Sequence, residues 1–168
     1  RGLTDKTQIT LETLAGIKIL DLNVKDGEVQ TVCVNMGSPE LVPKNIPIDS
    51  NLDRFISEDV EVDGKVYKVT GVSMGNPHAV TFIDDTDSLE IEKIGPKFET
   101  HKLFPKKINT EFAQIVDRNT IKMRVWERGA GETLACGTGA CATMVAANLN
   151  GLVDDEADLV LLGGTLHI

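Results

Sequence analysis

Alternating apolar and polar positions run along most of the chain and predict short strands joined by tight turns. Residues 17–24 and 29–34 alternate on either side of Asp26-Gly27, a dipeptide typical of a two-residue hairpin turn. The same pattern returns in the segments 9–11 before a break at Ala15-Gly16, 60–62 and 66–72 around Asp63-Gly64, 79–83, 111–116, 121–127, 159–162 and 165–168. No alternation of helices with strands predicts a parallel sheet, so we expect antiparallel neighbours.

Helical spacing occurs in three places. The longest run, from Ala140 to Ala147, is apolar on every side and ends at Asn150-Gly151, a glycine stop. Two shorter helices are predicted from Leu52, Phe55 and Ile56 after a cap at Ser50, and from Leu89, Ile91 and Ile94 before an interruption at Gly95-Pro96. Many antiparallel strands with one buried helix place the chain in the α+β class.

A proline-rich stretch divides the chain. Residues 37–47 hold three prolines and are typical of a crossing segment between two units, 1–37 and 38–168. With 41% hydrophobic and 4% aromatic residues, the chain can bury an aliphatic core.

Charge and cysteine content narrow the possible partners. The net charge is −9, and no basic cluster is longer than Lys106-Lys107, which argues against nucleic acid and acidic membrane surfaces. No apolar stretch is long enough to span a bilayer. Three cysteines without framework spacing indicate a reducing compartment, so we expect a cytoplasmic protein.

A cysteine stands before a glycine-rich turn at the start of the apolar helix. Residues 134–142 read Leu-Ala-Cys-Gly-Thr-Gly-Ala-Cys-Ala, with Cys136 at the helix N-terminus. Unpaired N–H groups and the positive end of the dipole meet there, so a lowered thiol pKa and an anion site are expected. Cys33 and Cys141 are interpreted as packed residues, and neither a metal site nor a disulfide framework is predicted.

Two further segments carry polar residues suited to chemistry. Asn76 and His78 flank a proline turn between strands, where each by itself would be read as a turn residue. The alternation of 121–127 puts Glu127, next to Arg128, on the apolar face of its strand. A carboxylate there must be paired or functional, because burial of an unpaired charge is costly.

Together these segments resemble the diaminopimelate epimerase family. The resemblance is carried by Gly-Asn-Pro-His-Ala-Val at 75–80, Ile-Asn-Thr-Glu-Phe-Ala-Gln at 108–114, and the stretch 127–142 that contains the Cys-Gly-Thr-Gly turn. It implies strands wrapped around a central helix in each of two similar domains. It also implies cofactor-independent, PLP-free conversion of LL- to meso-diaminopimelate by a two-base cysteine mechanism, in lysine biosynthesis.

The resemblance further implies roles for particular residues. Cys136 matches the second-domain cysteine, Glu127 would pair with Cys136 or a substrate ammonium, and His78 would poise the opposite thiol. The residues expected to bind substrate are Asn76, Asn109, Glu127 and Arg128 through their side chains, and Gly137 and Thr138 through their backbone N–H groups.

The same resemblance implies that residues 1–37 are remnant strands of an N-terminal domain and that 38–168 are a nearly complete C-terminal epimerase domain. The first-domain cysteine would precede Arg1, so we expect the chain by itself to be unable to epimerise. A homodimer is expected of the full-length protein, acting on a small-molecule substrate.

Two other functions fit the same residues. A proline racemase or hydroxyproline epimerase would also use opposed cysteines before such a turn, but it would not need Asn76, Asn109 and Arg128 to hold a second amino-acid end. A non-catalytic module that binds small anions at the Cys136 helix is the alternative of another class.

Overall fold

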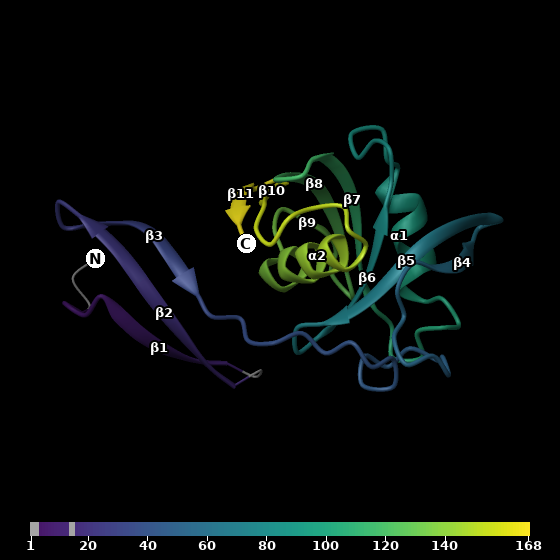
Figure 1. Ribbon diagram of the computed structural model, residues 1–168, viewed down its shortest axis with the longest axis horizontal. Helices are drawn as coiled ribbons and strands as arrows, with labels where there is room; N and C mark the ends of the chain where they lie inside the picture. The colour runs from purple at the N-terminus through teal and green to yellow at the C-terminus, as the bar shows by residue number, and fades with distance from the viewer. Residues whose placement is uncertain (1–3, 14–15) are drawn as a thin grey trace. The chain divides into compact units, whose positions relative to one another are not determined.

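A computed structural model describes residues 4–13 and 16–168 and divides the chain into two compact units, Arg1–Gly37 and Ser38–Ile168 (Figure 1). Ala15, part of the predicted break, lies outside the described residues. The elements are β1 (Gln8–Thr13), β2 (Gly16–Lys25), β3 (Glu28–Val34), β4 (Glu58–Val62), β5 (Lys65–Ser73), β6 (Pro77–Phe82), α1 (Ile91–Glu99), β7 (Asn109–Asp117), β8 (Thr120–Glu127), β9 (Gly131–Thr133), α2 (Gly137–Leu149), β10 (Asp158–Leu161) and β11 (Gly164–His167).

The first unit is a three-stranded antiparallel sheet in the order β1-β2-β3. Its second hairpin turns at Asp26 and Gly27, which both adopt positive φ (53° and 78°), as the predicted two-residue turn requires. The expectation that Cys33 is packed is wrong, because the Cys33 side chain is exposed. Among the described residues of this unit none is buried, so the three strands by themselves do not enclose Cys33.

The second unit is built on an eight-stranded sheet within residues 38–168, all of which are described. Its strand order is β11-β10-β8-β7-β6-β5-β4, and β9 pairs with β8. Most neighbours are antiparallel, but β6 pairs with β7 and β8 pairs with β10 in parallel. The expectation of antiparallel neighbours alone is therefore wrong. Each parallel pair needs a long crossover connection, and α1 and α2 supply the two crossovers.

The two helices pack on separate hydrophobic clusters of this unit. Helix α2 contacts β5, β6 and β7, whereas α1 contacts β4, β7, β8 and β9. The predicted apolar helix is confirmed as α2, and Figure 1 shows the sheet curving around it. Its buried residues lie on every side, which is typical of a helix enclosed by the core. The α+β class with strands around a central helix is thus confirmed.

The predicted interruption at Gly95-Pro96 is wrong, because α1 continues through both residues to Glu99. Pro96 removes one backbone donor, but bonds from Ile94 N to Glu90 O (3.3 Å) and from Thr100 N to Pro96 O (3.2 Å) hold the two ends. Gly95 faces the Trp126 ring so closely that a Cβ would lie 2.4 Å from a ring atom. The glycine therefore serves packing between α1 and β8 rather than a helix stop.

The short helix predicted after Ser50 is also absent, since residues 50–56 contain no helix. The Ser50 hydroxyl accepts a hydrogen bond from Leu52 N (3.2 Å), which closes only a local turn. Phe55 is buried, and its carbonyl accepts from Gly71 N (2.8 Å), so the backbone continues beside β5. Tertiary pairing with a strand outweighs a weak local helical preference here.

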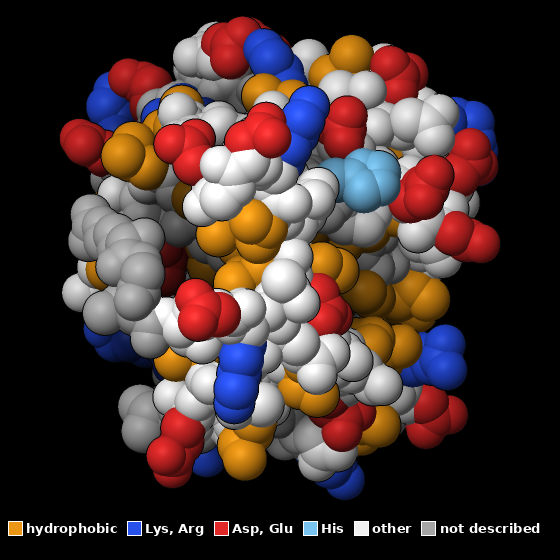
Figure 2. Space-filling model, turned by 90° about the vertical axis from the view of Figure 1, so that its left-hand side faces the viewer, with side chains coloured by type: hydrophobic (Ala, Val, Ile, Leu, Met, Phe, Trp, Pro, Cys, Tyr) orange, Lys and Arg blue, Asp and Glu red, His pale blue; other side chains and the backbone are white. Residues whose placement is uncertain are grey.

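One face of the molecule shows how the charged side chains are distributed. On the face shown in Figure 2, acidic side chains alternate with Lys and Arg, without a broad basic area. Within the described part of the chain, no helix has the length and apolar character needed to cross a membrane.

Candidate active site

Cys136 is the N-cap residue of α2. Its backbone is extended (φ −138°, ψ 106°), and its Sγ accepts a hydrogen bond from Gly139 N at 3.4 Å. The Thr138 hydroxyl lies 3.5 Å from the same sulfur. Gly137 and Thr138 begin the helix, so their N–H groups have no intrahelical acceptor and can bind an anion. The predicted thiol at a helix N-terminus is confirmed by this geometry.

The thiol nevertheless differs from the sequence expectation in its acidity. The Cys136 side chain is only 8% exposed, and burial raises the pKa of the thiol. The nearby Glu111 and Glu127 carboxylates raise the pKa further, whereas hydrogen bonds from Thr138 and Gly139 lower it. Desolvation outweighs the donors at the helix terminus, so Cys136 is a thiol at neutral pH.

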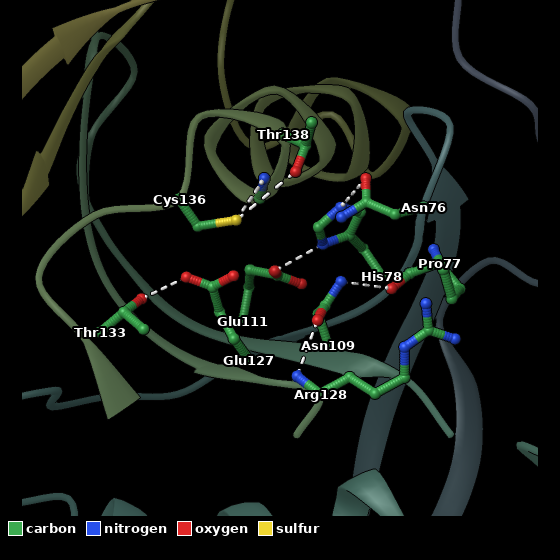
Figure 3. Close-up of polar contacts among 11 residues, drawn as sticks. Asn76, Pro77, His78, Asn109, Glu111, Glu127, Arg128, Thr133, Cys136 and Thr138 are labelled. Carbon is green, nitrogen blue, oxygen red and sulfur yellow. Dashed lines mark hydrogen bonds and ion pairs between the residues drawn. The ribbon is translucent and has the colours of Figure 1, made fainter. Parts of the chain in front are cut away.

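His78 lies on β6 in the interior, rather than on a solvated turn. Its Nδ1 is 2.6 Å from Glu111 Oε1, and both side chains are completely buried. Its Nε2 is 3.0 Å from Asn76 Oδ1. Figure 3 shows Asn76, His78 and Glu111 in line across the space below the start of α2.

Glu111 is a site residue that sequence reasoning missed, although it belongs to the segment 108–114. Burial raises the pKa of its carboxyl, the neighbouring Glu127 raises it further, and His78 opposes both. The signal that could have found it is the alternation of its strand, which places Glu111 on the same face as the apolar residues Ala113 and Ile115. A Glu at the centre of a buried strand demands a partner, which the structure supplies as His78.

Glu127 lies beside Cys136 and Glu111 in Figure 3, as the alternation of β8 predicts. The Thr133 hydroxyl donates to its Oε1 at 2.5 Å. The Glu127 carboxylate is thus held at the site by a strand neighbour.

Asn109 and Arg128 lie side by side, but their polar groups bond to the protein itself and not toward the expected substrate position. The Asn109 amide donates to Pro77 O (3.0 Å) and accepts from Arg128 N (2.8 Å), so it joins three segments of the site. The Arg128 guanidinium donates to Lys106 O (2.9 Å) and points away from Cys136 in Figure 3. The structure therefore gathers Cys136, His78, Glu127, Asn76 and Asn109, but leaves the Arg128 side chain outside.

The cluster brings together groups that can transfer protons. Among the described residues, no group of three or more His, Cys, Asp and Glu side chains could hold a metal ion. A thiol, a His–Glu pair and a second carboxylate can exchange protons with a carbon acid whose carboxylate sits at the helix N-terminus.

Comparison with known sequences gives a consistent set of similar proteins. The family model described as diaminopimelate epimerase matches residues 70–168. A diaminopimelate epimerase of Acetivibrio thermocellus is 60% identical over the whole chain, which covers 60% of that protein. One of Methanococcus maripaludis is 53% identical, again over the whole chain and 61% of the relative. The chain thus spans about three fifths of the length of these relatives.

Comparison with solved structures concerns the fold alone. A probable proline racemase from Agrobacterium radiobacter K84 aligns with a TM-score of 0.69 at 16% identity, over 99% of this chain and 53% of that one. A hydroxyproline epimerase from Agrobacterium vitis aligns with a TM-score of 0.68 at 13% identity, over 98% of this chain and 51% of that one.

Proposed function

The chain belongs to the diaminopimelate epimerase family, and on this premise we propose that the complete protein converts LL-diaminopimelate to meso-diaminopimelate without a cofactor. The observation that carries the proposal is the Cys136 thiol at the start of α2, between Glu127 and the His78–Glu111 pair. The α-carbon of an amino acid is a very weak acid. The negative charge that develops in the transition state therefore needs hydrogen-bond donors aimed at the substrate carboxylate.

In the proposed reaction, the substrate carboxylate binds the N–H groups of Gly137 and Thr138. A thiolate from the first domain removes the α-proton from one face of the carbon. Cys136, a thiol because burial raises its pKa, delivers a proton to the opposite face. The C–H bond breaks on one side and forms on the other, the S–H proton of Cys136 is consumed, and the configuration inverts.

Glu127 and Asn76 serve binding in this proposal. The carboxylate of Glu127, held by Thr133, is suited to the substrate ammonium or to the proton of Cys136. Asn76 reaches His78 with its Oδ1 and keeps its Nδ2 for a substrate carboxylate oxygen. The Arg128 guanidinium reaches the substrate only if its hydrogen bond to Lys106 O breaks. Asn109 acts indirectly, because its amide links the backbone of Arg128 to that of Pro77.

We assign residues 38–168 to the C-terminal epimerase domain and the sheet at 1–37 to the N-terminal domain. The division of the chain after Gly37 and the incomplete coverage of the relatives support this assignment. We also propose a homodimer of the full-length protein, supported by the family resemblance, and a cytoplasmic location, supported by the cysteine pattern. Sedimentation of the complete protein tests the homodimer.

The test is stereochemical. The complete protein is incubated with LL-diaminopimelate in D₂O, and formation of deuterated meso product is followed, with proline and hydroxyproline as competing substrates. We expect turnover of diaminopimelate alone. Turnover of proline or hydroxyproline instead would support the racemase alternative, and absence of all turnover would contradict the proposal.

Two variants identify the sulfur that reacts. Cys136→Ala should lose at least about a thousandfold in kcat, because a proton donor in the transition state is removed. Cys141→Ala is the matched control, since Cys141 is a buried cysteine of the same helix, and it should retain activity. Equal losses in both variants would indicate a structural effect. Normal turnover by the 168-residue chain would show that the two-cysteine assignment is wrong.

A further inference from the structure

Glu111 has no role in the proposed reaction so far, yet it makes the shortest contact to His78. We propose that Glu111 is a positioning residue that shares one proton with Nδ1 of His78 and thereby makes Nε2 a stronger base toward the opposite cysteine. This inference rests on the proposed function and on the role that the family resemblance implies for His78, which is to poise that thiol.

The hydrogen bonds of His78 determine how many protons the pair holds. Nε2 faces Asn76 Oδ1 at 3.0 Å, and a carbonyl oxygen only accepts, so Nε2 carries a proton. Nδ1 and Glu111 Oε1 are 2.6 Å apart, so a single proton lies between them. The arrangement therefore has two protons on His78 and Glu111 together and a net charge of zero.

The pair changes the charge balance of proton uptake. A lone buried histidine that accepts a proton passes from neutral to positive in an environment that stabilises charge poorly. His78 and Glu111, both completely buried, pass instead from one negative charge to neutral. Proton uptake then removes a buried charge rather than creating one. The raised pKa of the Glu111 carboxyl, caused first by burial, agrees with this preference for the neutral pair.

In the proposed transfer, a proton moves from sulfur to nitrogen. The S–H bond of the opposite cysteine breaks, its electron pair stays on sulfur as a thiolate, and the proton forms a new bond to His78 Nε2. The proton between Nδ1 and Glu111 Oε1 stays where it is. The new Nε2–H donates to Asn76 Oδ1, which is the contact that the structure contains.

Two packing observations indicate that Glu111 serves the site rather than the fold. Its second oxygen, Oε2, is buried without a hydrogen-bond partner among the described residues, an arrangement that costs stability. The helix α2 also has a glycine where it meets the carboxyl, since a Cβ at Gly139 would lie 2.6 Å from Glu111 Oε1. Gly139 therefore leaves room for the Glu111 carboxyl, although burying that carboxyl is unfavourable for stability.

The decisive variant is Glu111→Gln in the complete protein. Glutamine keeps the volume, and its carbonyl oxygen can still accept a hydrogen bond from Nδ1–H, but it carries no charge and does not share the proton. Glu132→Gln is the matched control, because Glu132 is a half-buried carboxylate paired with Arg124 on β8. A thermal unfolding scan verifies that both variants fold.

Nitrogen NMR of ¹⁵N-histidine provides the spectroscopic readout at neutral pH. In the wild type and in Glu132→Gln, both ring nitrogens of His78 should be of the protonated type, with a strongly downfield Nδ1 proton. In Glu111→Gln, one ring nitrogen should become unprotonated. The same His78 pattern in wild type and Glu111→Gln would overturn the inference.

Kinetics separates this inference from the proposed function. Glu111→Gln should lower kcat by about 10- to 100-fold, as expected for loss of a charged hydrogen-bond partner, with KM little changed. Glu132→Gln should leave both constants unchanged. An active enzyme with unaltered kcat in Glu111→Gln would refute the inference while the function stands. An inactive wild type with the expected NMR pattern would refute the function alone.

Discussion

At the scale of single residues, the site depends on how burial competes with hydrogen bonding. Cys136 receives a bond from Gly139 N at the helix N-terminus, the feature that by itself favours a thiolate. Its low exposure and two acidic neighbours act in the other direction, and the net effect is a raised pKa. The residue is thus suited to donate a proton before it accepts one.

This balance predicts an order of cysteine alkylation in the 168-residue chain. Exposed Cys33 should react with iodoacetamide first at neutral pH, because Cys136 is buried and protonated. Labelling of Cys136 should then rise about tenfold per pH unit while the pH is below its pKa, since only the thiolate reacts. Peptide mass spectrometry measures both rates. Cys136 labelling as fast as Cys33 near neutral pH would contradict the protonated thiol.

The raised pKa of Glu111 should make the free energy of unfolding depend on pH. Its folded pKa is raised above the value of about 4.3 in an unfolded chain, so the folded state takes up its proton first as pH falls. The stability of wild type relative to Glu111→Gln should therefore increase as pH falls toward about 4.3, and decrease as pH rises through the folded pKa. Urea unfolding of both proteins at several pH values measures the difference. A difference that shrinks on acidification would be inconsistent with the raised pKa.

At the scale of elements, the start of α2 combines capping and close packing. Gly139 donates to the Cys136 sulfur, and its missing side chain leaves room for Glu111. Gly137, two residues earlier, has open space around its Cα. The two glycines of the Cys-Gly-Thr-Gly turn are therefore not equivalent.

Alanine substitutions should separate the two glycines. Gly139→Ala places a Cβ 2.6 Å from Glu111 Oε1 and 3.2 Å from Cys136 Sγ, so we expect a loss of about 1–3 kcal/mol from overpacking. Gly137→Ala meets nothing within 4 Å, so its stability should change by less than about 1 kcal/mol. Urea unfolding compares them. Equal stability of both variants would show that the carboxyl moves aside without cost.

At the scale of the whole molecule, the two units differ in how much they bury. Residues 38–168 contain both hydrophobic clusters, whereas the described residues of 1–37 include none that is buried. A three-stranded sheet without a covered face is marginally stable by itself. We therefore expect the first unit to be only marginally stable by itself.

Hydrogen exchange should detect this difference. In the 168-residue chain, amides of β1–β3 should exchange at least about a hundredfold faster than those of β6–β8, because local opening exposes little new apolar surface there. In the complete protein, the protection of β1–β3 should rise if they belong to the N-terminal domain. Equal protection of both units in the short chain would be the opposite result.

The sequence by itself determined the features that depend on local pattern. Period-two alternation and Asp-Gly turns are sufficient for the hairpins, and the apolar run between Gly139 and Gly151 is sufficient for the buried helix with Cys136 at its start. These signals are strong because the residues that create them are neighbours in the chain. The position of Glu127 on the inner face of β8 follows in the same way.

Only the tertiary structure decided the contacts between distant segments. Glu111 and His78 are 33 residues apart, so no periodicity links them, and their pairing depends on the parallel alignment of β6 with β7. The close packing of α1 at Gly95 depends on the Trp126 ring, and the raised pKa of Cys136 depends on enclosure by the core. Burial, the cause common to these results, comes from residues far apart in sequence, so local pattern does not determine it.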